Sequence, residues 1–206
     1  MRDYFLLILL ATAVFQILGM VIAWLSVKRL AKHQNTILLT ELIIMIIIST
    51  EILVYSVSIS YKAIFGFIAG LLLVYLINRF VPHKHVDEKQ RLSMLVFIAM
   101  CIHEFPEGVA FGSTYILNSG VGIFTAALMA LHNIPEGSIV AMPYLLKHRV
   151  KKAFMLTAGT QVLYILGGIG AYFMLVSLSA AGQAISACIA SGAMIFVAFE
   201  ELQFLR

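Results

Sequence analysis

Charged residues are scarce in this chain of 206 residues, where Asp, Glu, Lys and Arg together make up 12% of the sequence. Hydrophobic residues make up 62%, and the mean hydropathy is +1.00. These values lie outside the range of soluble globular domains. The composition therefore excludes a soluble protein and predicts an integral membrane protein.

Cysteine is scarce as well. The only two cysteines, Cys101 and Cys188, lie in apolar segments and form no C-x-x-C pair, which excludes a disulfide framework. Cys188 is interpreted as a small buried hydrophobe. Cys101 stays open, because it lies two residues before His103.

The apolar residues form runs of roughly 20, the length needed to cross a hydrocarbon core of about 30 Å. The first run is longer than a signal-peptide core and lacks a clear cleavage site, so we expect it to be a spanning helix. The sequence thus predicts an all-α fold, a polytopic transmembrane helix bundle that forms one domain over residues 1–206. The expected spans are residues 4–27, 37–60, 63–81, 92–117, 121–145, 153–177 and 182–204.

The basic residues gather in three of the connections between these spans. Eleven of the 14 Lys and Arg residues follow the first, third and fifth spans, whereas the opposite connections hold only Lys62. By the positive-inside rule, this predicts a plasma-membrane protein with its N-terminus outside and its C-terminus inside. The net charge of +4 is therefore read as a topology signal, with the lipid bilayer as partner and no nucleic acid.

The longest polar stretch, residues 82–91, is expected to be a cytoplasmic loop. It contains His83 and His85, and alternate residues of an extended chain can both reach one transition-metal ion. A solvated charged loop with two idle histidines explains the same residues.

The second span carries two carboxylates. Glu41 is close to its cytoplasmic end, where a side chain can reach the interface, so we expect no special role for it. Glu51 sits deeper and can line a polar route through the membrane or bond to a neighbouring helix.

A nine-residue pattern, M-x-x-H-x-x-P-E-G, occurs twice within apolar runs, beginning at Met100 and at Met129. On a helix, His103 shares a face with Glu107, as His132 does with Glu136. Each proline leaves a backbone carbonyl without its helical donor and is expected to kink the helix, and each following glycine permits close helix contact. A short turn at residues 118–120 makes the two helices antiparallel neighbours.

Two imidazoles and two carboxylates at one depth suit a borderline divalent ion such as zinc, iron, manganese or cadmium. Glu104 and Asn133 point further round their helices and can hold a second ion. Met100 lies on the histidine face, where packing is the favoured role. A buried hydrogen bond would be the better explanation for one histidine, but the duplication of the whole pattern favours a metal site.

The paired H-x-x-P-E-G helices resemble the fourth and fifth transmembrane helices of the ZIP (Zrt/Irt-like) family of divalent metal transporters. Residues 66–83 look like the third helix of that family and the start of its histidine-bearing loop. Residues 192–202 are similar to its seventh helix, which makes Glu200 and Glu201 candidate accessory ligands.

The resemblance implies a binuclear transport site with outlying ligands from the second and sixth helices. Carried over to this chain, the central ligands are His103, Glu104, Glu107, His132, Asn133 and Glu136. The family often has a Glu where Tyr164 stands here, so Gln161 becomes an accessory candidate and the second ion is in question. The family has eight spans where seven are expected here, and the exposed apolar face can call for a homodimer.

The function expected from these patterns is secondary transport or facilitated uptake of a divalent transition-metal cation toward the cytoplasm. The ion, zinc in the first place, is the substrate, and no organic cofactor is expected. A metal-binding sensor or subunit that does not transport is the alternative. An enzyme is not expected, because a membrane-embedded metallohydrolase would require the second histidine of H-E-x-x-H, which the sequence H-E-F-P-E lacks.

Overall fold

The structure is a computed structural model that describes residues 4–80 and 88–202. These residues form seven helices and no strand, which confirms the prediction of an all-α bundle. The helices are α1 (Phe5–Lys32), α2 (Gln34–Ile59), α3 (Ala63–Phe80), α4 (Glu88–Leu117), α5 (Ser119–Leu145), α6 (Val150–Leu175) and α7 (Ala180–Glu201).

Five of the helices, α1, α2, α5, α6 and α7, are long and apolar enough to cross a membrane. The described apolar part of α3, Ala63–Ile77, is shorter, so seven spans remain a prediction. Residues 88–91, expected at the end of the polar loop, lie instead in the first turn of α4. His83 and His85 fall outside the described residues.

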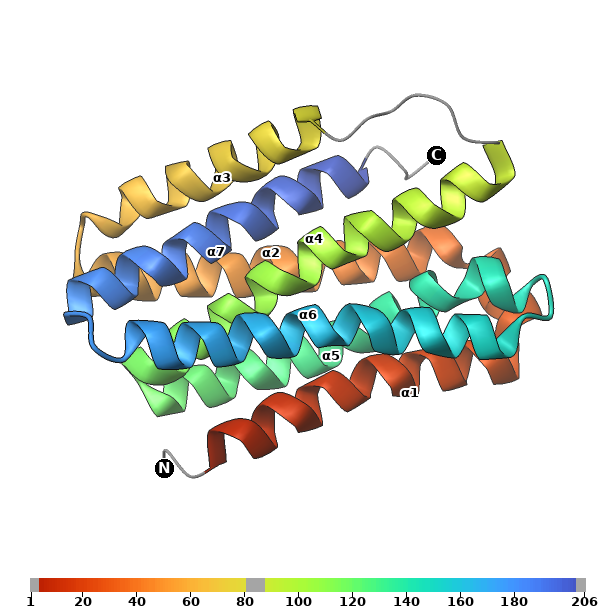
Figure 1. Cartoon of the computed structure of the whole chain (residues 1–206), viewed down its shortest axis with the longest axis horizontal. Helices are drawn as coiled ribbons and strands as arrows, with labels where there is room; N and C mark the ends of the chain where they lie inside the picture. Colours follow the sequence, from red (N-terminus) through yellow and green to blue (C-terminus); the bar gives the residue numbers. More distant parts are fainter. Residues whose placement is uncertain (1–3, 81–87, 203–206) are drawn as a thin grey trace.

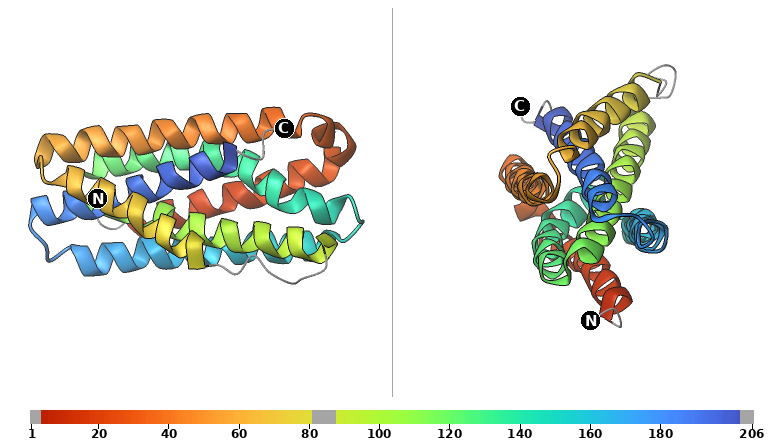
Figure 2. Two further views of the ribbon diagram at one scale, coloured as in Figure 1. Left: turned by 90° about the horizontal axis from the view of Figure 1, so that it is seen from above. Right: turned by 90° about the vertical axis from the view of Figure 1, so that its left-hand side faces the viewer.

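The helices lie side by side and alternate in direction, with α1 along one edge of the bundle and α3 along the opposite edge (Figure 1). Viewed end-on, α4, α5 and α7 lie toward the middle, and α1, α2, α3 and α6 surround them (Figure 2). The most extensive packing joins α1 to α5, α4 to α6 and α3 to α7. The two helices that carry the repeated motif therefore have one face turned to the interior, and their outer faces, with Phe105 in α4 and Leu131 in α5, are exposed.

A short capped turn sets α4 and α5 antiparallel. Asn118 is extended at φ −158° and ψ 116°, and its side chain accepts hydrogen bonds from Gly120 N at 2.9 Å and Val121 N at 3.3 Å. These bonds satisfy backbone donors that the first turn of α5 would otherwise leave unpaired. The expected turn at residues 118–120 thus places the two motifs on adjacent helices.

The motif glycines, Gly108 and Gly137, allow α6 and α1 to pack closely against the motif helices. A Cβ atom at Gly137 would lie 2.8 Å from Gln16 C in α1, and one at Gly108 would lie 2.8 Å from Tyr164 C in α6. Both distances are too short for any side chain, so only glycine allows these backbones to approach. The predicted role of both glycines in close helix contact is confirmed, and it brings the polar residues of α1 and α6 up to the motif.

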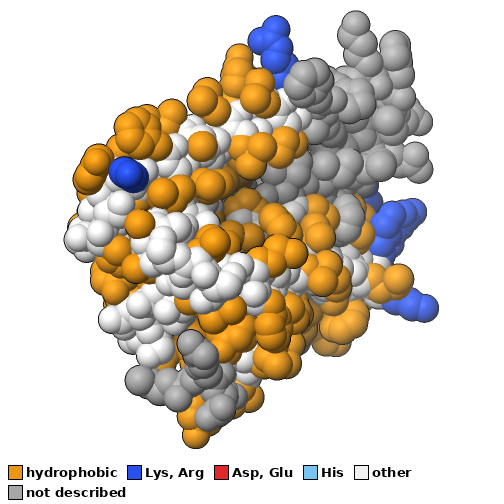
Figure 3. Space-filling model, turned by 60° about the vertical axis from the view of Figure 1, so that its left-hand side comes forward, with side chains coloured by type: hydrophobic (Ala, Val, Ile, Leu, Met, Phe, Trp, Pro, Cys, Tyr) orange, Lys and Arg blue, Asp and Glu red, His pale blue; other side chains and the backbone are white. Residues whose placement is uncertain are grey.

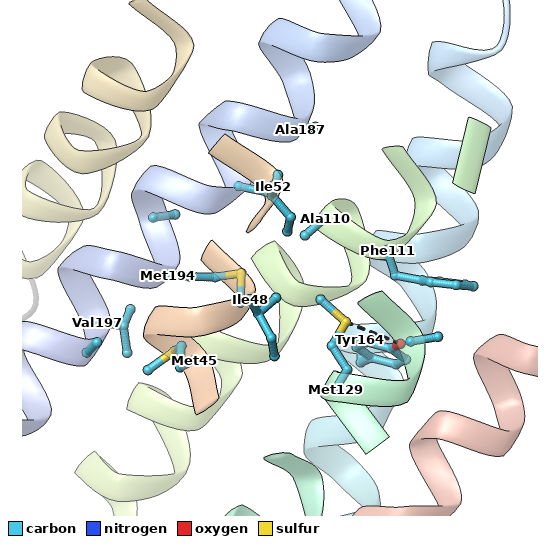
Figure 4. Packing of buried hydrophobic residues seen from close by; sticks show 14 of the residues in the cluster. Met45, Ile48, Ile52, Ala110, Phe111, Met129, Tyr164, Ala187, Met194 and Val197 are labelled. Atoms are coloured by element: carbon cyan, nitrogen blue, oxygen red, sulfur yellow. Dashed lines mark hydrogen bonds between the residues drawn. The ribbon is translucent and has the colours of Figure 1, made fainter. Parts of the chain in front are cut away.

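Apolar side chains fill much of the interior of the bundle. They also cover most of the outer face that Figure 3 shows. The largest buried cluster includes Met45, Ile48 and Met194, which lie between α2 and α7, and Met129 of α5, which lies beside Tyr164 (Figure 4). On the face drawn in Figure 3, hydrophobic side chains predominate, and the visible Lys and Arg side chains lie near its edges. An apolar outer surface of this kind matches a hydrocarbon environment.

Candidate metal centre

Four side chains from the two motif helices meet in the interior of the bundle. Helices α4 and α5 run on through Pro106 and Pro135, and each places one histidine and one glutamate on the face toward the other helix. One ligand atom from each of these residues lies within 4.8 Å of the others. All four are buried, and we refer to them as the metal quartet: His103, Glu107, His132 and Glu136.

Glu107 occupies the middle of the quartet. Its Oε1 atom lies 2.8 Å from His103 Nε2 and 3.1 Å from His132 Nε2, so one carboxylate from α4 joins both imidazoles. The two Nε2 atoms are 3.3 Å apart, and Glu136 Oε2 lies 3.9 Å from His132 Nε2. The donors predicted to share a site therefore do converge, across the interface of α4 and α5.

The orientation of His132 is fixed from its far side. Its Nδ1 atom lies 3.2 Å from the backbone carbonyl oxygen of Glu41 in α2. A carbonyl oxygen can only accept a hydrogen bond, so Nδ1 carries the proton when the ring is neutral and Nε2 presents its lone pair to the quartet. Metal-binding histidines are held in this way by a hydrogen bond from the other ring nitrogen.

The arrangement of nitrogen and oxygen atoms in the quartet is suited to binding a cation. In the neutral tautomer, the lone pair of His132 Nε2 faces a carboxylate oxygen and a second imidazole nitrogen, at 3.1 and 3.3 Å. In this buried, low-dielectric place the lone pairs can be satisfied by a proton on His103 Nε2 or by a cation bound among them. Two imidazole nitrogens and two carboxylate oxygens are a ligand set that suits zinc and similar divalent ions.

The structure places Glu104 and Asn133 next to the quartet, but both are bonded to other helices. Glu104 Oε1 accepts hydrogen bonds from Gln161 Nε2 at 2.5 Å and from the amide of Gln16. Asn133 Nδ2 donates to Thr12 O in α1 at 3.1 Å. Glu104 does not belong to the group of four whose ligand atoms converge. The Asn133 Oδ1 atom is buried without a hydrogen-bond partner among the described residues.

Two residues close to the centre were not found from the sequence. The prediction that Glu41 reaches the interface is wrong, because Glu41 is fully buried and its backbone carbonyl supports His132. Gln16, also fully buried, reaches Glu104 from α1. In both cases the sequence shows a single polar residue within an apolar run. Such a residue can be recognised as unusual, but the sequence does not indicate which side chain or backbone group it contacts.

The accessory candidates are spread over the bundle. Gln161 reaches the centre through Glu104, whereas the Glu51 carboxylate accepts a hydrogen bond from Thr125 Oγ1 at 3.3 Å. Met100 is buried in α4, and Glu200 lies in the last turn of α7. Glu201 belongs to the same turn, but its side chain lies outside the described part of the chain, as do His83 and His85.

An apolar layer closes the centre on the side of the α4–α5 turn. Tyr164, fully buried in α6, lies against Met129 with its hydroxyl group 3.8 Å from the sulfur atom (Figure 4). Phe111 and Ile48 continue this layer from α4 and α2. An ion at the quartet is therefore separated from that end of the bundle by packed side chains.

Comparison with known proteins adds no identification. No protein-family model matches the chain, and no curated protein matches it. The resemblance to the ZIP family therefore remains an expectation from the motifs. The plain result is a membrane-helix protein with a buried His/Glu cluster that could bind a metal ion.

Proposed function

We propose that this protein carries a divalent transition-metal cation across the membrane toward the cytoplasm, as a transporter of the ZIP type. The observation that carries the proposal is the metal quartet, in which two imidazoles and two carboxylates from adjacent helices converge within 4.8 Å in the interior of a membrane bundle. Ionisable groups at such depth are costly to keep and mark ion pathways. Zinc is the first candidate, with iron, manganese and cadmium as the alternatives.

The energetics favour entry. A divalent cation that moves into a negative-inside cell gains about 4.6 kcal/mol per 100 mV, from two charges at about 2.3 kcal/mol each. The protein then has to replace the water that the ion loses, which the nitrogen and oxygen donors of the quartet do. Orientation with the N-terminus outside and residence in the plasma membrane belong to this proposal, and they rest on the distribution of Lys and Arg.

Radiometal uptake by cells that express the chain tests the proposal, with competition among zinc, iron, manganese and cadmium to order their preference. Substitutions His132→Ala and Glu136→Ala should each abolish uptake, because each removes a donor of the quartet. Membrane insertion, followed by the amount of protein in the membrane fraction, should be unchanged. Unchanged uptake in both variants would refute the proposal.

A second candidate function is a metal sensor or subunit without transport. It is favoured by Tyr164, which is fully buried where the ZIP family often has a metal-binding Glu. Purified protein in proteoliposomes separates the two functions. Binding of zinc together with zinc flux supports a transporter, whereas binding without flux supports a sensor.

A further inference from the structure

A buried hydrogen-bond network lies beside the metal quartet and joins α1, α4 and α6. Gln161 Nε2 donates to Gln16 Oε1 at 2.7 Å and to Glu104 Oε1 at 2.5 Å. Gln16 Nε2 donates to the same oxygen of Glu104, and Thr160 Oγ1 donates to Gln16 Oε1 at 3.0 Å. We call Gln16, Thr160 and Gln161 the amide clamp. All of them are at most 4% exposed.

Both glutamines of the clamp donate to Glu104 through their amide nitrogens. An amide nitrogen has two hydrogens, and Gln161 spends them on two different acceptors. The Gln16 carbonyl oxygen accepts from both Thr160 and Gln161. A carboxylate only accepts hydrogen bonds, so its contacts with both glutamines require that they turn their N–H groups toward it.

We infer that the centre holds one divalent ion per chain, bound by the metal quartet, and that Glu104 is a positioning residue held by the amide clamp. This inference rests on the proposed function. It departs from the binuclear site that the family resemblance implies. Asn133 is attached to the same helix as Gln16, because its Nδ2 atom donates to Thr12 O in α1. Its Oδ1 atom is buried and has no hydrogen-bond partner among the described residues, so Asn133 itself does not decide between one ion and two.

The charges agree with a single ion. Neutral imidazoles with the carboxylates Glu107 and Glu136 balance one divalent cation. A second would bring two more positive charges against the one carboxylate of Glu104, at a place where the N–H dipoles of two glutamines already point. Helix α6 offers no further anion there, since residues 150–175 contain no Asp or Glu. Buried charge without compensation is strongly unfavourable.

Zinc stoichiometry tests the inference directly. Purified full-length protein in detergent is dialysed against Zn²⁺ alone, and the bound metal is measured by elemental analysis. The wild type should bind one zinc per chain, and Glu107→Gln none at the same free zinc concentration. Two zinc ions in the wild type would overturn the single-ion inference and leave the transport proposal standing, whereas no zinc would refute both.

The role of the clamp is tested by replacing its two glutamines with glutamates. The double variant Gln16→Glu with Gln161→Glu should bind a second zinc, because the N–H donors are replaced by anionic oxygens. The matched control Gln183→Glu places a carboxylate at a buried glutamine in α7 and should still bind one. A folded double variant that also binds one would contradict the idea that the amides close the second position.

The role of Glu104 has a spectroscopic test that does not depend on the double variant. Co²⁺ bound in place of zinc reports the number and type of its ligands through its visible absorption. Glu104→Gln should leave this spectrum unchanged and raise the Kd by about 10-fold, as expected for a residue outside the ligand set. A spectral change as large as that in Glu107→Gln would show that Glu104 is a ligand and overturn the inference.

Discussion

Substitution of Gly137 by Ala should destabilise the protein and weaken metal uptake, although it adds only one methyl group. The new Cβ would lie 2.8 Å from Gln16 C and 3.0 Å from Gln16 Cγ, and α1 would have to move outward. Overpacking costs about 1–3 kcal/mol, and the upper part of that range applies because the obstacle is backbone. Alanine returns about 0.5–1 kcal/mol of helix propensity, so the net loss is about 2 kcal/mol.

The shift of α1 also reaches the metal centre, because Gln16 holds Glu104 and Thr12 holds Asn133. The assay is thermal unfolding in detergent, paired with zinc uptake into proteoliposomes. The matched control is Gly170→Ala in α6, where a Cβ would meet nothing within 4 Å. The reasoning is refuted if Gly137→Ala is as stable and as active as Gly170→Ala.

Three further outcomes follow from particular contacts. Asn118→Ala removes the cap of α5 and should lower the free energy of unfolding by about 1 kcal/mol, measured by denaturation in mixed micelles; no change would argue against the cap. Ser191→Ala removes a 2.7 Å hydrogen bond from α7 to Ser49 O in α2 and should cost about 0.6 kcal/mol in the same measurement. Zinc at about 100 times its Kd should stabilise the wild type by about 2.7 kcal/mol, an effect that a chelator reverses. Glu107→Gln should show no such effect, and equal stabilisation of both proteins would place the ion elsewhere.

The pairing of the two motifs could be predicted because the residue spacing within each motif determines which side chains share a helix face. A spacing of four residues puts His103 with Glu107 and His132 with Glu136, and the short turn at residues 118–120 makes their helices neighbours. Helix positions were also predictable, since apolar runs of this length leave few other folds. Their ends differ by a few residues: α1 continues to Lys32, for example, whereas the expected span ended at residue 27.

The contributions of α1 and α2 could not be predicted, for a physical reason. Gln16 and Glu41 are single polar residues in apolar helices, and the sequence does not say which face of each helix turns inward. Glu41 was placed at the interface from its distance along the span, but packing of α2 against α5 buries it. The hydrogen-bond partners of Glu104 could not be predicted either, because Gln16 and Gln161 belong to helices far from Glu104 in the sequence.

The most direct test of the central claim is X-ray absorption at the zinc edge of the zinc-loaded protein. The account predicts two imidazole nitrogens and two carboxylate oxygens at about 2.0–2.2 Å, with the imidazole contribution halved in His103→Ala. A first shell of water oxygens or sulfur atoms, or an imidazole count unaffected by His103→Ala, would contradict the claim that α4 and α5 jointly hold the ion.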